Sequence, residues 1–167
     1  MALVKKLTNY LEKNKIKYKT IKHRTVYTAW DLAKTMHISK MSTITKTLIV
    51  KADREYLIVL LPANKNLDKN KFKKVVNQQR KKDGLKAIKK ISFVKENWLK
   101  KTIKLGKIGA IPPFAGLLKL PLFIDRGILK NKKIFVNSGD YQIALEISSK
   151  ALVKLEQPIQ GSFSKKK

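Results

Sequence analysis

Lys46 is the first residue in this chain whose type and position could serve chemistry. It lies in the apolar segment TITKTLIVKA, residues 43–52, which is typical of the start of a buried strand. A lysine ammonium is a compact positive charge with three donors, and it suits a phosphate or a polarised carbonyl oxygen. The alternative is an ordinary strand-end lysine whose charged end reaches water. Lys46 is therefore a candidate cation at the rim of a pocket.

The segment GAIPPFAG, residues 109–116, is a second candidate. Adjacent prolines hold the backbone extended, and the flanking glycines permit close approach of the backbone to a ligand. Such a loop could present rigid backbone groups to a small polar substrate. A plain connection between a helix and a strand explains the pattern equally well. The residues that we place at a site here are Gly109, Ile111, Pro112, Pro113 and Phe114.

Two further segments could complete a site. HRTVYTAWDLA, residues 23–33, has His23 at a strand end and Tyr27 just before a helix N-terminus, which favours anions and carbonyl oxygens. VNSGDYQIALEI, residues 136–147, has polar turn residues between two strands. A strand-to-helix connection and a hairpin turn are the structural alternatives. The candidate residues in these two segments are His23, Tyr27, Asn137, Ser138 and Gly139.

Several kinds of chemistry are excluded. The chain has no cysteine, which rules out disulfides, thiolate metal sites and a cysteine nucleophile. Two histidines cannot form a histidine-rich metal site, and neither a glycine-flanked serine elbow nor a phosphate-binding GxxxxGK motif occurs. We expect no metal or cofactor. An enzyme with this sequence would work by positioning and by backbone dipoles.

The charge of the chain favours a nucleic-acid partner. Lysine and arginine number 39 against 11 acidic residues, a formal net charge of +28, and only four of the 39 are arginine. Arginine is the usual residue for bidentate base contacts, so a lysine surface indicates attraction to phosphates without base readout. A general compositional bias is the alternative. No apolar stretch is long enough to span a membrane and no secretory signal is evident, so a cytoplasmic protein is expected.

The elements that must position these residues form one domain. Apolar spacing predicts a helix over 2–14, an edge strand over 15–23, a helix opening at Thr28, and a β-hairpin over 44–62 that turns at Ala52–Glu55. The second hairpin strand, 56–61, is apolar throughout and is expected at the centre of a sheet. His37 is expected in a left-handed conformation at a helix end.

The second half of the chain alternates in the same way. A surface helix follows over 66–78, and Ser92 is expected to cap a helix through Trp98 and Lys101. Strands are predicted at 120–125, 132–137 and 141–148, before a helix at 148–155. The prediction is an α+β domain, residues 1–156, with a mixed, strongly curved sheet surrounded by helices. Residues 157–167 are predicted to be a disordered basic tail.

Three of these segments, in this order, resemble the YbaK/prolyl-tRNA-synthetase-associated domain family of aminoacyl-tRNA editing deacylases. They are HRTVYTAWDLA; TKTLIV followed by LIVLLPANKNLD; and GAIPPFAG followed by LPLFID. The similarity covers nearly the whole chain. It implies that Lys46 is the family's signature lysine, which holds the aminoacyl-adenosine end of a mischarged tRNA. It also implies that the Gly109 backbone contacts the substrate. The residues that would line the pocket are His23, Val26, Tyr27, Thr28, Asn137, Ser138 and Gly139.

The resemblance implies a trans-editing enzyme that hydrolyses the ester of mischarged tRNA, with tRNA and an aminoacyl-tRNA synthetase as partners. Two departures from the family pattern concern activity and substrate: Ala115 stands where glycine is usual, and Ala144 lies near a position that is aspartate in some members. The alternative is a non-catalytic protein on the same fold that binds tRNA or a synthetase, because a fold does not fix a function.

Overall fold

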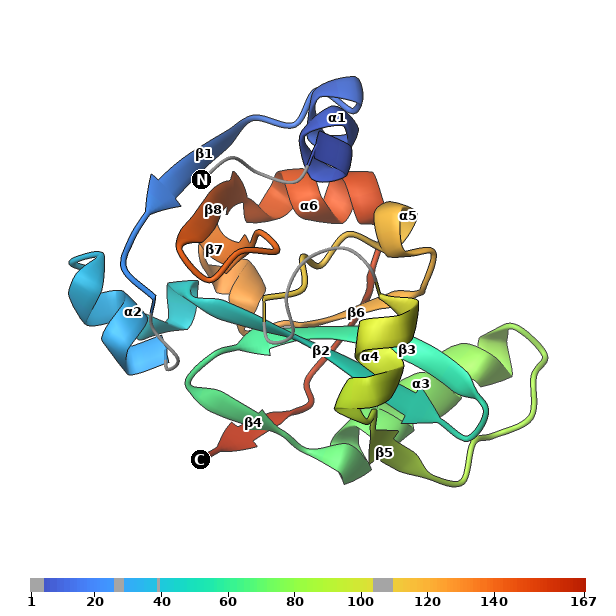
Figure 1. Ribbon diagram of the computed structural model, residues 1–167. Helices are drawn as coiled ribbons and strands as arrows, with labels where there is room; N and C mark the ends of the chain where they lie inside the picture. The colour runs from blue at the N-terminus through green and yellow to red at the C-terminus, as the bar shows by residue number, and fades with distance from the viewer. Residues whose placement is uncertain (1–4, 26–28, 39, 104–109) are drawn as a thin grey trace.

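The computed structural model of the chain describes residues 5–25, 29–38, 40–103 and 110–167. It is an α+β structure in which helices surround three β-sheets (Figure 1). The helices are α1 Lys5–Lys13, α2 Ala29–Thr35, α3 Lys69–Lys82, α4 Glu96–Thr102, α5 Ala115–Leu118 and α6 Ser149–Glu156, with short 3-10 turns η1 Met41–Thr43 and η2 Ile128–Lys130. The strands are β1 Tyr18–Lys22, β2 Thr45–Ala52, β3 Glu55–Pro62, β4 Lys65–Leu67, β5 Ile91–Phe93, β6 Leu122–Asp125, β7 Lys133–Asn137, β8 Ile143–Ser148, β9 Ile159–Gly161 and β10 Ser164–Lys166.

The largest sheet has five strands in the order β5-β2-β3-β6-β9. β2 and β3 form the predicted antiparallel hairpin, in register from Thr45 opposite Pro62 to Ala52 opposite Glu55. β6 lies parallel to both β3 and β9, so the sheet is mixed. β3 is central, as its continuous apolar sequence predicts, because a strand covered on both faces cannot alternate with polar residues.

Two hydrophobic cores lie on the two faces of this sheet. Alternate residues of β3 point to opposite faces. Ile58 and Leu60 join the core shared with α1 and α6, whereas Val59 and Leu61 join the core beneath α3. Both cores are closed to water, since all four of these side chains are fully buried.

A second sheet, β1-β8-β7, is antiparallel and lies against the first half of β2. The two sheets meet where Ile44 bridges Phe135, and the Thr45 hydroxyl donates a hydrogen bond of 2.8 Å to the Phe135 carbonyl. A hydroxyl buried among apolar groups requires such a partner. This junction fixes the distance between β2 and the far end of β7.

Two predictions for the second half of the chain are wrong. The predicted tail forms β9, which pairs with β6, and β10, which pairs with β4. Phe163 anchors it: this side chain is fully buried, and its N–H donates to the Asp125 carboxylate at 2.9 Å. The basic composition of 157–167 concealed this single apolar anchor.

The second error concerns Ser92, which lies within β5 and does not cap a helix. The helix begins later, at Glu96, after Lys95. By contrast, His37 does adopt the predicted left-handed conformation, with φ of 56°. The predicted helix start at Thr28 lies outside the described residues. In the part of the chain that the structure describes, no helix is long and apolar enough to cross a membrane.

We predict that Phe163→Ala will lower the free energy of unfolding by about 3–5 kcal/mol, because it empties a fully buried aromatic site. Urea denaturation at equilibrium measures the change. The matched control is Ser162→Ala, which alters an exposed neighbour and should change stability by less than about 0.5 kcal/mol. Equal stability of the two variants would contradict an ordered C-terminal segment.

Candidate active-site cleft

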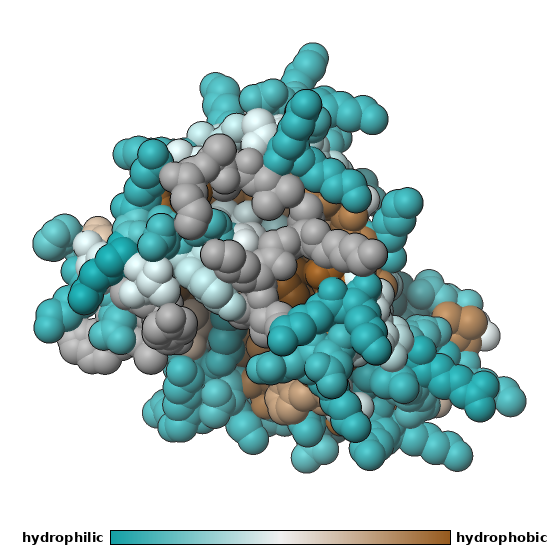
Figure 2. All heavy atoms as spheres, viewed as in Figure 1, coloured by the Kyte–Doolittle hydropathy of each residue, from teal (hydrophilic) through white to brown (hydrophobic). Residues whose placement is uncertain are grey.

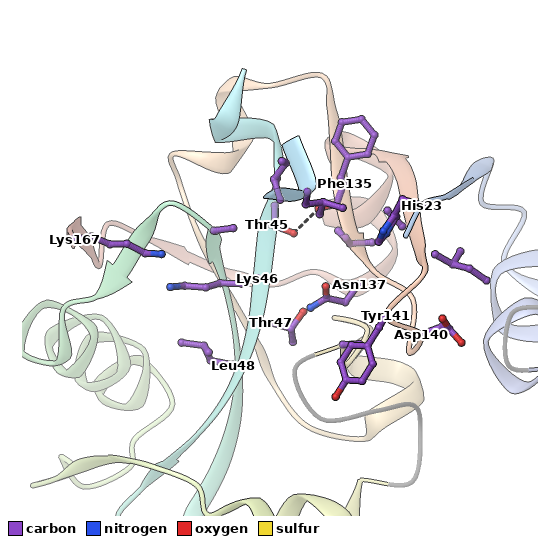
Figure 3. A pocket seen from close by; sticks show the side chains of 17 residues that line it. His23, Thr45, Lys46, Thr47, Leu48, Phe135, Asn137, Asp140, Tyr141 and Lys167 are labelled. Carbon is purple, nitrogen blue, oxygen red and sulfur yellow. Dashed lines mark hydrogen bonds between the residues drawn. The ribbon is translucent and has the colours of Figure 1, made fainter. Parts of the chain in front are cut away.

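A cavity of about 400 Å³ lies where the first half of β2 faces the end of β7 and the start of β8 (Figure 3). It opens there because β5 pairs with β2 only from Val50 to Ala52. On that side, in the described part of the chain, no strand pairs with residues 46–49. Its apolar walls come from Leu32, Ile44, Ala63, Phe135, Ile143 and Ala144.

Lys46 lies at this free edge. Its side chain lines the cavity and is half-buried. Figure 3 shows that it leaves β2 on the side of Lys167, whereas His23 and Asn137 lie on the other side of the strand. Burial lowers the pKa of Lys46, and the nearby positive charge of Lys167 lowers it further. Both effects make the ammonium easier to deprotonate than an exposed lysine.

The opposite face of β2 presents two threonines. Thr45 and Thr47 are both buried, with exposed fractions of 4% and 7%. The Thr45 hydroxyl is paired with Phe135, as described above, but the Thr47 hydroxyl has no hydrogen-bond partner. Thr47 lines the cavity, and Figure 3 shows its side chain beside that of Asn137. The Thr47 hydroxyl is therefore an unused donor and acceptor in the wall of the cavity.

The predicted site residues of the turn after β7 have different roles. Asn137 lines the cavity. Ser138 does not: it is 1% exposed, and its hydroxyl donates to the Ile143 carbonyl at 2.6 Å. Gly139 has φ of 94°, a conformation that favours glycine, and its N–H donates to the Ala110 carbonyl at 2.7 Å. Ser138 and Gly139 thus build the turn and fix the adjacent loop.

The proline-rich loop contributes less to the cavity than the sequence indicated. Ala110 lines it, whereas Ile111, Pro112, Pro113 and Phe114 are buried and do not. Ile111 and Phe114 belong to the core beneath α1, where Phe114 lies 5.9 Å from the Tyr10 ring. Their apolar side chains gain more from burial there than from an open cavity.

Of the remaining predicted site residues, one lines the cavity and the others lie outside the described part of the chain. His23 lines the cavity, and its backbone N–H donates to Gln142 at 2.9 Å. Gly109, Val26, Tyr27 and Thr28 lie outside the described residues. Among the residues that are described, no group of three histidine, cysteine or acidic side chains could hold a metal ion.

Sequence reasoning missed Thr47, Tyr141 and Asp140, which also line the cavity. A signal for Thr47 was present. At the start of this strand, threonine at 45 and 47 and lysine at 46 place polar groups on both faces. A charged residue at 46 is disfavoured in a fully packed strand, so the pattern indicates that this end of the strand is open on one face.

The fold and the cleft define a class of protein, and comparison with known proteins agrees. The model of the aminoacyl-tRNA editing domain family matches residues 23–155. The chain therefore belongs to this family, which confirms the resemblance seen in its motifs. No curated protein matches the sequence.

Solved structures share the fold. Hypothetical protein APE2540 is 22% identical, with a TM-score of 0.78 over 96% of this chain and 100% of its own. A protein proposed as a trans-editing enzyme for prolyl-tRNA synthetase is 15% identical, with a TM-score of 0.74 over 98% of this chain and 99% of its own. A scaffold protein used for epitope grafting is 16% identical, with a TM-score of 0.75 over 96% and 95% of the two chains.

We predict opposite stability changes for two matched substitutions on the same face of β2. Thr47→Val should raise the free energy of unfolding by up to about 1 kcal/mol, because it removes a buried hydroxyl that has no partner. Thr45→Val should lower it by about 1 kcal/mol or more, because it breaks the bond to Phe135. Urea denaturation of both variants tests the assignment, and changes of the same sign would contradict it.

Proposed function

We propose that this protein is a trans-editing aminoacyl-tRNA deacylase that hydrolyses the ester of mischarged tRNA. One observation carries the proposal: in a chain of the editing-domain family, the half-buried Lys46 ammonium lies at the mouth of a cleft that an open strand edge creates. The cleft combines a few polar side chains with apolar walls, as a site for an amino acid requires.

In this proposal, Lys46 holds the ester end of the substrate. A water molecule attacks the ester carbonyl carbon, the bond to the ribose oxygen breaks, and a free amino acid and a tRNA hydroxyl result. A cation beside the carbonyl stabilises the negative charge that develops on its oxygen. An aminoacyl ester is already activated, so a few kcal/mol of such stabilisation gives a large rate gain.

The amino-acid part would then lie between the sheets. Thr47 and Asn137 provide hydrogen-bonding groups there, and the apolar walls limit the size of the side chain that enters. His23 and Ala110 close the cleft from the side of β1 and of the proline-rich loop. We assign the adjacent Gly109 backbone to substrate contact from its match to the family motif.

Ala115 stands where the family pattern has glycine, and it begins α5. The next residue is Gly116, where an added Cβ would collide with the Tyr10 hydroxyl, so the glycine at 116 is required for packing. A protein that only binds tRNA or a synthetase remains the alternative. The largely hydrophilic surface in Figure 2, in a chain of formal net charge +28, would serve it equally well.

We predict that Lys46→Ala will reduce deacylation by at least about 100-fold, which corresponds to about 2.7 kcal/mol of transition-state stabilisation. Lys46→Arg should also be impaired, because a planar fork does not replace a compact ammonium. The assay is release of the amino acid from a panel of mischarged tRNAs.

The control is Lys51→Ala on the same strand. The Lys51 ammonium lies 5.7 Å from the centroid of the Tyr56 ring, and Lys51 does not line the cleft. It should retain activity. If Lys46→Ala and Lys51→Ala hydrolyse the substrate equally, at equal thermal stability, Lys46 is a surface residue and the proposal fails.

The lowered pKa of Lys46 gives a further prediction. The catalysed rate needs the ammonium, so it should fall as the pH rises through the pKa of Lys46, which lies below the ordinary lysine value of 10.5. A pH profile of deacylation, corrected for spontaneous hydrolysis at each pH, measures this. Lys46→Ala should lack the alkaline fall, and an identical fall in that variant would assign it to another group.

A further inference from the structure

A second hollow lies on the other face of β2 and meets the cleft at Lys46. Lys46 and Leu48 line both hollows. The second, which we call the β2–β4 groove, is bounded by Asn66, Lys69, Phe93 and Lys165. A ligand whose reacting end lies in the cleft can therefore continue over the open edge of β2 into this groove.

Phe93 is the unusual residue of the β2–β4 groove. It is 56% exposed, and it is one of only two large hydrophobic side chains that are exposed in the described part of the chain. Phe93 pairs with Val50 across the sheet, so its side chain lies on the same face as Lys46 and Leu48. An exposed aromatic ring presents a face on which a planar group can stack.

The groove also carries positive charge. The Lys69 ammonium lies 4.6 Å from the centroid of the Phe93 ring, and Lys165 lies across the groove on β10. Among the described residues that line the groove, Asp68 is the one acidic side chain. Its carboxylate accepts the Lys71 N–H at 3.1 Å and caps α3. Lys46, Lys69 and Lys165 thus line the same groove as the Phe93 ring. The Asp68 carboxylate there already accepts a backbone hydrogen bond.

We propose that the β2–β4 groove binds the single-stranded nucleotides that precede the esterified adenosine at the 3′ end of tRNA. A base stacks on Phe93, and Lys69 and Lys165 neutralise phosphates. From Lys46 to Val50 the strand extends about 13 Å, enough for at least two nucleotides. This combination of an aromatic platform with flanking cations is how proteins bind single strands without reading sequence.

This inference rests on the proposed function, which places the 3′ end of the RNA in the cleft. Its test does not need hydrolysis. The probe is a fluorescent single-stranded RNA that ends in CCA, and its affinity is measured by anisotropy at fixed salt. Phe93→Ala should weaken binding by about 5- to 150-fold, which is the loss of one stacked base. Phe93→Tyr keeps an aromatic face and should bind nearly as well as the original chain.

The matched control is Leu85→Ala, the other exposed large hydrophobic residue, which is 52% exposed and lies outside the groove. If Phe93→Ala and Leu85→Ala bind the RNA equally, Phe93 is not a stacking platform and the inference is overturned. If polyglutamate displaces the RNA from the original chain and from Phe93→Ala with equal ease, the groove is only a site for anions, and the inference is overturned as well.

Hydrolysis separates this inference from the proposed function. Phe93→Ala should raise the KM for mischarged tRNA and leave kcat within about twofold, whereas Lys46→Ala lowers kcat. If no mischarged tRNA is hydrolysed by the original chain but Phe93→Ala still weakens RNA binding, the proposed function fails and the groove stands. If hydrolysis occurs and Phe93→Ala alters neither KM nor RNA affinity, only the groove fails.

Discussion

The incomplete pairing of β2 is the constraint on which the site depends. Along its whole length β2 pairs with β3, but β5 covers its other edge only from Val50 to Ala52. An unpaired edge is costly in a β protein, because its backbone groups need partners and attract other strands. Here the β7–β8 hairpin approaches the edge near Phe135, and Lys46 keeps a charge beside it. The cleft lies between the β7–β8 hairpin and Lys46.

The two faces of β2 acquire separate roles from this arrangement. Because side chains alternate along a strand, a ligand at the edge meets Thr47 on one face and Lys46 on the other. The threonine face lies against the second sheet and is nearly dry, whereas the lysine face is open to the β2–β4 groove. The end of β2 can therefore hold the apolar part of a ligand on one face and its anionic part on the other.

The centre of the fold could be predicted from the sequence, because β2 and β3 are long and β3 is strongly apolar. The β2–β3 hairpin, the central place of β3 and the left-handed His37 all follow from local pattern. The C-terminal strands could not be predicted, because β10 depends on distant contacts between Phe163 and Asp125. The lysine-rich sequence beside Phe163 has no local pattern that indicates these strands.

The site was predicted less completely, and for a related reason. Lys46, His23 and Asn137 were identified and do line one cavity. Family motifs, however, contain structural residues as well as functional ones. Ser138 is a turn residue, Phe114 is a core residue and Asp68 is a helix cap. A motif alone does not separate these roles, since each side chain is fixed in its place by tertiary packing.

The pairing of β1 with β8 has a consequence for folding. Tyr18 lies opposite Ile147, so the second sheet joins segments near the two ends of the sequence. Loop closure over such a separation is slow compared with the formation of the local β2–β3 hairpin. The central hairpin should therefore form early, and the cleft only when β1 and β8 meet. Until then a chain of charge +28 presents its lysines on an unfinished surface, where any nearby polyanion can bind before the specific site exists.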